Sequence, residues 1–224
     1  MGEVDLHVHS TLSHSSAVSI ENLAQVYRAS RRPLVTVTDY DSIEGCRRLR
    51  ELLPEQTVLF GLEIRTAEGH FLIFSTDEAY LASLGQPFES VRQLRRGEDT
   101  VVIWAHPGVS QRAKGWEAPE LPVVHAVAPF IDGLEIYNGT MMSLAGEGSV
   151  RRNYFSNLVR VALDRSLAMT GGSDTHEAEM VFRCGTKYPD EVRDAADLVR
   201  AIKQRRVAPV YDHRFFNVNI SISG

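Results

Sequence analysis

The 224-residue chain lacks several features that would assign it to a particular class of protein. Its two cysteines, Cys46 and Cys184, are too few for a disulfide framework and too far apart for a zinc-type pair. We therefore expect a reducing, cytoplasmic environment. No apolar run approaches the ~20 residues that cross a bilayer. The first residues already resemble a strand, so we expect neither a membrane partner nor a signal peptide.

The chain also lacks an excess of positive charge. Its formal net charge is −5 and its isoelectric point is about 5.9. Binding a long nucleic acid requires a basic stripe that neutralises successive phosphates, so we expect no such partner. The charge does not exclude a nucleotide or a short oligonucleotide end that binds at one cationic site. The composition, 43% hydrophobic and 24% charged, is ordinary for a folded domain and predicts no particular oligomeric state.

Strand-like and helix-like segments alternate along almost the whole chain. Strands are predicted at 4–8, 34–38, 58–64, 69–74, 101–105, 133–138, 167–170 and 207–222. Helices are predicted after the capping residue Ser19 and at 43–53, 148–165 and 194–205, with an irregular segment at 109–129. This α/β alternation predicts a mostly parallel sheet, and about seven units favour one TIM-like barrel domain over residues 1–224.

Histidines and acids gather after these predicted strands. The residues concerned are His7, His9, Asp39, Glu63, His106, Asp174 and His176. Side chains two apart on a strand point to one face, so His7 and His9 would present two imidazoles together. Taken alone, such a histidine pair is also compatible with a solvent-exposed strand edge that binds no metal. Because barrel active sites lie at the carboxyl ends of strands and imidazole is a common metal ligand, the whole pattern favours a metal-dependent enzyme.

Five motifs, in order, resemble those of the polymerase-and-histidinol-phosphatase (PHP) family of metallohydrolases. They are Asp5-Leu6-His7-Val8-His9-Ser10 with His14, Thr38-Asp39-Tyr40-Asp41, Gly61-Leu62-Glu63-Ile64 with Gly69-His70, Ala105-His106-Pro107, and Gly172-Ser173-Asp174-Thr175-His176. The resemblance covers essentially the whole chain. It implies a distorted (β/α)7 barrel that holds two to three divalent ions of zinc, manganese or iron.

The resemblance also implies a set of metal ligands. They are His7, His9, His14, Glu63, His70, His106, Asp174 and His176, and we add Asp39 as a further candidate ligand. Glu63 would bridge an ion held by the first two histidines and Asp174 to a second ion held by His70 and His106. His14 and His176 would belong to a third ion.

The second motif departs from the family pattern, because Tyr40 stands where the family usually has histidine. A phenol that ionises near pH ~10 is a poor metal ligand. Three interpretations stay open: the third site is weak or empty, it recruits Asp39 or Asp41, or Tyr40 donates a hydrogen bond to the substrate. Manganese or iron would tolerate the change better than zinc, since both accept oxygen ligands more readily.

The predicted function is that of a metal-dependent phosphoesterase. A metal-bound hydroxide would attack a small phosphate ester, a nucleotide or a short oligonucleotide, with Asp174, Glu63 and His176 as catalytic residues. Candidate substrate-binding residues are Tyr40, Arg112, Lys114 and Arg183. Each of the three cations, Arg112, Lys114 and Arg183, is by itself also explained as a surface residue in contact with solvent. Two alternatives are a metallohydrolase acting on an ester, amide or carbamate bond, and a non-catalytic metal-binding module.

Two further residues bear on the site. Glu135 alternates with apolar neighbours at a predicted strand end, where it either orients a ligand histidine or forms a buried ion pair. His213, between Asp212 and Arg214, is predicted to be a surface residue.

Overall fold

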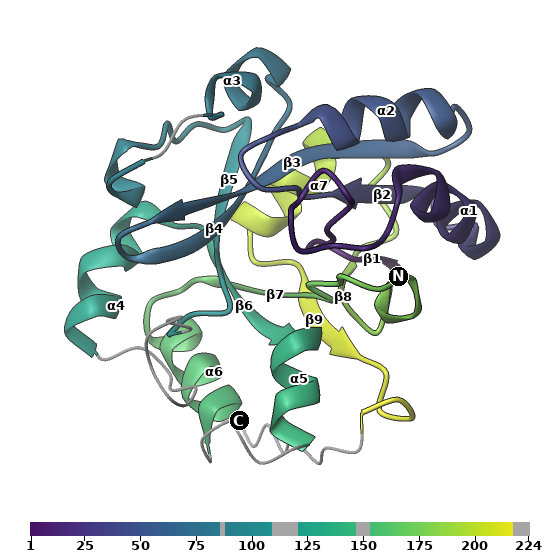
Figure 1. Cartoon of the computed structure of the whole chain (residues 1–224). Helices are drawn as coiled ribbons and strands as arrows, with labels where there is room; N and C mark the ends of the chain where they lie inside the picture. The colour runs from purple at the N-terminus through teal and green to yellow at the C-terminus, as the bar shows by residue number, and fades with distance from the viewer. Residues whose placement is uncertain (86–87, 109–120, 147–152, 217–224) are drawn as a thin grey trace.

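A curled six-stranded sheet forms the centre of the molecule (Figure 1). The computed structural model describes residues 1–85, 88–108, 121–146 and 153–216. In spatial order the strands are β2 (Leu34–Val37), β3 (Thr57–Thr66), β4 (Gly69–Ser75), β5 (Thr100–Ala105), β6 (Gly133–Asn138) and β7 (Ala168–Gly172). A second sheet, antiparallel throughout, has the order β1 (Gly2–Val4), β8 (Cys184–Tyr188) and β9 (Ala208–Tyr211).

Helices follow most strands of the larger sheet. They are α1 (Ile20–Ser30), α2 (Glu44–Leu52), α3 (Glu78–Ser83), α4 (Leu121–Val127), α5 (Gly139–Gly146), α6 (Tyr154–Asp164) and α7 (Ala195–Lys203). The predicted cap of α1 is confirmed, since the hydroxyl of Ser19 accepts a hydrogen bond from the Asn22 amide at 3.1 Å. In the described part of the chain, no helix combines the length and apolar character needed to span a membrane.

Side chains of the curled sheet alternate between two separate cores. Leu59, Leu72 and Ile103 belong to one core together with the apolar side of α7. Their neighbours in the chain, such as Phe60 and Trp104, belong to the other core, which includes α1, α2 and α6. Since the period of a strand is two, Glu63, four residues after Leu59 in β3, lies on the same face as Leu59. The α7 face of the sheet is therefore apolar along most of its length and polar at the rim.

Residues His7–His9 join the two edge strands of the curled sheet at this rim. The Thr38 amide, just beyond β2, donates to the carbonyl of Val8 at 2.7 Å, and the Asp174 amide, just beyond β7, donates to the carbonyl of His7 at 2.7 Å. Val8 also forms a parallel bridge with Thr175. The segment thereby closes a ring of backbone at the carboxyl ends of the strands.

The mixed α/β fold is confirmed, and several finer predictions are corrected. β1 ends at Val4, so the predicted strand at 4–8 is wrong beyond that residue, because the chain leaves the small sheet to bridge the rim. β4 is the hairpin partner of β3, as predicted. It runs antiparallel to both of its neighbours, so the predicted count of about seven parallel strand–helix units is not confirmed. The sequence analysis missed β8. Residues 109–120, 147–152 and 217–224 of the predicted segments lie outside the described residues.

We predict that Thr38→Val lowers the free energy of unfolding by about 1–3 kcal/mol, because the buried Val8 amide loses its acceptor. The hydroxyl of Thr38 accepts a hydrogen bond from that amide at 3.0 Å. Urea denaturation measures the change. Thr57→Val, at the start of β3, is the matched control, since the Thr57 hydroxyl makes no hydrogen bond within the described residues. Equal stability of the two variants would contradict the role assigned to Thr38.

Candidate metal centre

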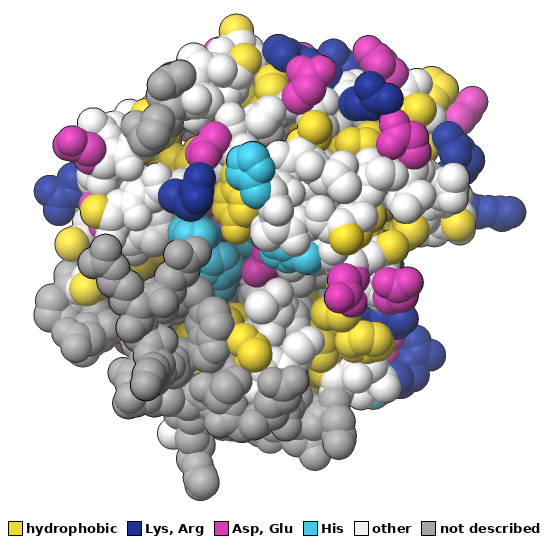
Figure 2. Space-filling model, viewed as in Figure 1, with side chains coloured by type: hydrophobic (Ala, Val, Ile, Leu, Met, Phe, Trp, Pro, Cys, Tyr) yellow, Lys and Arg dark blue, Asp and Glu magenta, His cyan; other side chains and the backbone are white. Residues whose placement is uncertain are grey.

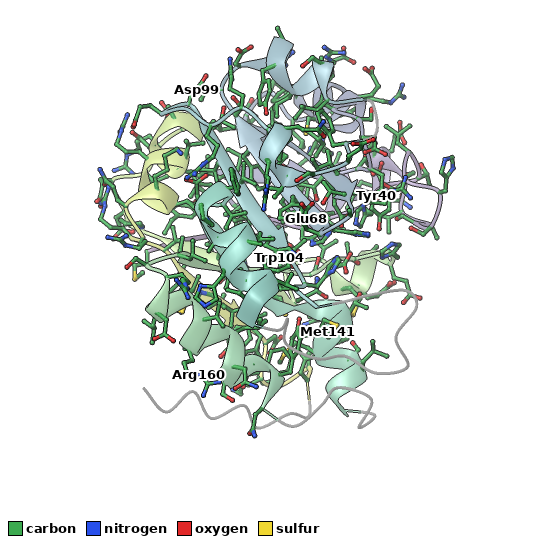
Figure 3. All side chains as sticks on the ribbon, turned by 90° about the vertical axis from the view of Figure 1, so that its left-hand side faces the viewer. Tyr40, Glu68, Asp99, Trp104, Met141 and Arg160 are labelled. Atoms are coloured by element: carbon green, nitrogen blue, oxygen red, sulfur yellow. The ribbon has the colours of Figure 1, made fainter. Side chains whose placement is uncertain are left out.

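Seven histidines and acids meet at the carboxyl rim of the curled sheet. They form four overlapping groups whose ligand atoms lie within 4.8 Å of one another: His7–His9–Glu63, His7–His106–Asp174, His9–Asp174–His176 and Glu63–His70–His106. We call these seven residues the histidine–acid cage. Figure 2 shows histidines around an acidic side chain in a hollow near the middle of one face. In Figure 3, Tyr40 and Met141, beyond β2 and β6, lie towards the same side of the molecule, whereas Asp99, before β5, lies towards the other.

Glu63 stands at the centre of the cage and is fully buried. Its Oε2 lies 3.0 Å from Nε2 of His7 and 2.9 Å from Nε2 of His9. Its Oε1 lies 2.7 Å from Nδ1 of His70 and 3.4 Å from Nε2 of His106. Each oxygen therefore faces a different pair of imidazoles, which is the arrangement that a carboxylate bridging two cations requires.

Asp174 completes the cage from the end of β7. Its Oδ1 lies 3.3 Å from Nε2 of both His7 and His9, and its Oδ2 accepts a hydrogen bond from the side-chain amide (Nδ2) of Asn138 at 3.2 Å. Asp174 has φ of 51° and His106 has φ of 28°. Positive φ is uncommon for residues other than glycine and is frequent at functional sites. Two cage residues thus adopt a backbone conformation that the surrounding structure must hold in place.

Hydrogen bonds behind the cage fix which nitrogen of each imidazole faces inwards. Nδ1 of His7 lies 3.0 Å from Oε1 of Glu135, so it donates to that carboxylate. Nδ1 of His9 lies 3.1 Å from Oγ of Ser13, whose own proton goes to Asp39 at 2.7 Å. Both Nε2 atoms are then acceptors that face carboxylate oxygens, which also only accept. These inward-facing nitrogen and oxygen atoms therefore suit the ligands of a divalent cation, and protons can take the place of that cation.

The same acids shift the pKa values of the cage. Burial lowers the pKa of His9, but hydrogen bonds that its ring donates to the carboxylates of Asp174 and Glu63 outweigh burial and raise it to about 9. Burial also opposes ionisation of Glu63, yet the neighbouring imidazoles, His7 first, hold its pKa well below the ordinary value. Because the acids of the cage stay ionised at neutral pH, positive charge between them is stabilising.

Two predicted ligands lie outside these groups. The buried carboxylate of Asp39 accepts hydrogen bonds of 2.7 Å from the Ser10 amide, the Ser10 hydroxyl and the Ser13 hydroxyl. It is therefore bound to the 10–13 turn and orients His9 through Ser13. His14 is exposed and belongs to none of the groups that the described residues form.

Tyr40 lies beside His9, a member of the third group of ligands, which His9, Asp174 and His176 form. Its ring stacks on that of His9 with centroids 4.7 Å apart, and the Arg65 guanidinium lies 5.1 Å from the centre of the Tyr40 ring. Burial raises the pKa of the Tyr40 phenol further above its ordinary value, so the side chain keeps its proton. Tyr40 is therefore placed to donate a hydrogen bond and is a poor ligand.

The predicted substrate-binding cations are not brought to the cage where the structure describes them. Arg183 pairs with Asp212 at 2.9 Å and its guanidinium lies 4.4 Å from the centre of the Phe215 ring. Arg112 and Lys114 lie outside the described residues. Ser13, Asn138 and Arg65 were not predicted as site residues from the sequence. A polar residue three positions after Glu135, in Glu135-Ile136-Tyr137-Asn138, was the available signal for Asn138.

The rim and its cage define a candidate metal centre on a curled α/β sheet, and proteins of the same fold include metal-dependent ones. A family model described as PHP-associated matches residues 158–207. No curated protein matches the sequence. The family model and the structures described next confirm the resemblance to the PHP family.

Three solved structures share the fold. A two-domain protein from Bacteroides vulgatus, containing a predicted PHP-like metal-dependent phosphoesterase, has 21% identity and a TM-score of 0.69; the match covers 93% of this chain and 64% of that one. A predicted metal-dependent phosphoesterase from Bifidobacterium adolescentis has 17% identity, a TM-score of 0.59 and coverage of 90% and 96%. A lesion-specific endonuclease from Pyrococcus furiosus has 14% identity, a TM-score of 0.57 and coverage of 91% and 56%. At these identities the likeness concerns the fold.

We predict that affinity for a divalent ion rises with pH. With its pKa raised to about 9, His9 carries a proton at neutral pH in the metal-free protein, and an ion must displace that proton. Between pH ~6 and ~8 the affinity should rise about tenfold per pH unit for each proton displaced. Calorimetry in buffers of different ionisation enthalpy measures the protons released per ion. A pH-independent affinity would show that the ion does not bind at His9.

We predict that Glu135→Gln weakens metal binding about 10- to 100-fold. Oε1 of Glu135 accepts from His7 and Oε2 accepts from the His106 amide at 2.9 Å, so a glutamine NH2 group must face a donor on one side. Competition with a chromogenic chelator measures the affinity, and a thermal melt checks the fold. The control is Glu51→Gln, an exposed position on α2. Unchanged affinity in Glu135→Gln would contradict the positioning role.

Proposed function

We propose that this protein is a metal-dependent phosphoesterase that hydrolyses small phosphate esters or nucleotides. The observation that carries the proposal is Glu63, whose two buried oxygens face His7 and His9 on one side and His70 and His106 on the other. Two cations on either side of such a carboxylate suit a phosphoryl group, because its oxygens carry the charge that develops during transfer. Zinc, manganese and iron are the proposed ions, since the ligands are imidazoles and carboxylates.

Different residues of the chain have different roles in the proposed hydrolysis. Divalent ions supply, when bound, a lowered pKa for water and neutralisation of phosphate oxygens. In hydrolysis a water oxygen bonds to phosphorus, the bond from phosphorus to the alcohol oxygen breaks, and one proton ends on that oxygen. Asp174 stays ionised, because His7 and its neighbours outweigh burial and lower its pKa, so it acts as a ligand. His176, half-buried with Nε2 2.8 Å from the Ser15 hydroxyl, is the proposed proton carrier.

The substrate class follows from charge. A net charge of −5 disfavours a long polyanion, and we retain small phosphate esters, nucleotides and short oligonucleotide ends as candidates. An endonuclease shares the fold, so the fold itself is compatible with a nucleic-acid substrate. Cys46 and Cys184 are both free and buried, which supports the proposed cytoplasmic location.

A second candidate is hydrolysis of an ester, amide or carbamate bond at the same centre. It is favoured by Tyr40, which leaves the third group without one imidazole and therefore with less capacity to neutralise a phosphate. Manganese-loaded protein should release phosphate from 4-nitrophenyl phosphate and leave 4-nitrophenyl acetate unchanged. Turnover of the acetate without phosphate release would establish this rival instead.

We predict that Glu63→Gln lowers kcat/KM for 4-nitrophenyl phosphate at least about 100-fold, which corresponds to about 2.7 kcal/mol of transition-state stabilisation. The amide keeps the size of the side chain and removes the charge between the two imidazole pairs. Elemental analysis should show loss of bound metal in the same variant and in His9→Ala. His213→Ala, at an exposed position, is the control and should keep both metal and activity. Full activity of Glu63→Gln would refute the bridging role.

A further inference from the structure

A cavity of about 270 Å3 opens beside the histidine–acid cage. Its walls comprise Asp174 and His176 of the cage, the α5 residues Thr140, Ser143 and Leu144, and the rim residues Thr175, Glu177 and Met180. We call it the α5 cavity. Its volume is below the ~300–1,000 Å3 typical of pockets for drug-sized ligands. A group attached to a phosphate at the cage and directed past His176 would enter it.

The wall formed by α5 is fixed to the loop that carries two cage residues. A Cβ atom at Gly139, the first residue of α5, would lie 2.3 Å from the carbonyl oxygen of Ser173, so glycine permits this close approach. The next residue, Thr140, donates its hydroxyl proton to the carbonyl of Asp174 at 3.3 Å. The distance between the cavity wall and the cage is thereby set by direct contacts.

The chemistry of the lining disfavours a negatively charged occupant. Leu144 and Met180 contribute apolar surface. The hydroxyl of Ser143 donates to the carbonyl of Gly139 at 3.1 Å, so like that of Thr140 it offers an occupant only acceptor lone pairs. Among the described lining residues, none is Lys or Arg, and Glu177 is the one charged side chain outside the cage. A second phosphate or a carboxylate in this cavity would meet Glu177, and the lining residues that the structure describes offer no Lys or Arg to compensate its charge.

We infer that the α5 cavity receives the leaving group of the substrate, and that this group is a small uncharged alcohol with an apolar body. Glu177 is then a specificity-determining residue that rejects leaving groups with an additional negative charge. The inference rests on the proposed phosphoesterase function. It narrows the substrate from phosphate esters in general to monoesters of uncharged alcohols, and it places nucleoside bisphosphates and oligonucleotides among the poor substrates.

The test compares 4-carbamoylphenyl phosphate with 4-carboxyphenyl phosphate, which have nearly the same shape and differ by one charge. For the manganese-loaded wild-type protein, we expect kcat/KM to be about tenfold lower for the carboxylate, from like-charge repulsion at short range. Glu177→Gln should reduce this ratio to about two- or threefold, since it removes the repelling charge. Glu179→Gln, an exposed position nearby that does not line the cavity, is the matched control and should keep the wild-type ratio.

Binding of the two corresponding phenylphosphonates, measured by calorimetry, separates this inference from the proposed function. If neither ester releases phosphate but the phosphonates bind with a ratio that depends on Glu177, the phosphoesterase proposal fails, and the α5 cavity keeps its role as a binding site that rejects negative charge but not its role as a leaving-group site. If both esters are hydrolysed equally well by the wild-type protein, or Glu177→Gln leaves the ratio unchanged, the cavity assignment is overturned and the phosphoesterase proposal stands. Absence of both hydrolysis and phosphonate binding overturns both.

Discussion

The site depends on one electrostatic constraint: the buried carboxylate of Glu63 lies between two pairs of imidazoles whose inward-facing nitrogens include acceptors. Acceptor atoms about 3 Å apart repel one another unless positive charge lies between them. Glu135 and the Ser13–Asp39 pair bind the outer nitrogens of His7 and His9, so they impose this condition on the inner ones. A divalent cation satisfies it, and in the metal-free protein protons do, already at neutral pH.

The fold places this constraint where substrate can reach it. The same face of the curled sheet packs Leu59 and Leu72 against α7 and carries Glu63 and His70 at the rim, so an apolar core lies directly beneath the polar site. Residues His7–His9 close the rim by hydrogen bonds to both edge strands. The first motif of the sequence therefore has a structural task as well as a chemical one. Helix α5 adds a wall to the cavity beside the cage and contributes none of the cage residues.

Much of this arrangement could be predicted from the sequence, for identifiable reasons. The His7–His9 pair and the acids and histidines after successive strands are readable because strand ends converge at one rim. The fate of Asp39 was not readable, because nothing in the spacing shows that Ser10 and Ser13 would occupy both of its oxygens. Arg183 follows the fifth motif in sequence, yet tertiary packing turns it to Asp212. The antiparallel direction of β4 followed from its hairpin signal, which the count of barrel units did not take into account.

The most direct test of the proposed bridged metal centre is a crystal structure of manganese-loaded protein with anomalous diffraction recorded near the manganese absorption edge. The account predicts at least two anomalous peaks, about 3.5–4 Å apart, with one oxygen of Glu63 bound to each. Data showing no peak among His7, His9, His70 and His106, or a single ion that Glu63 does not touch, would contradict it.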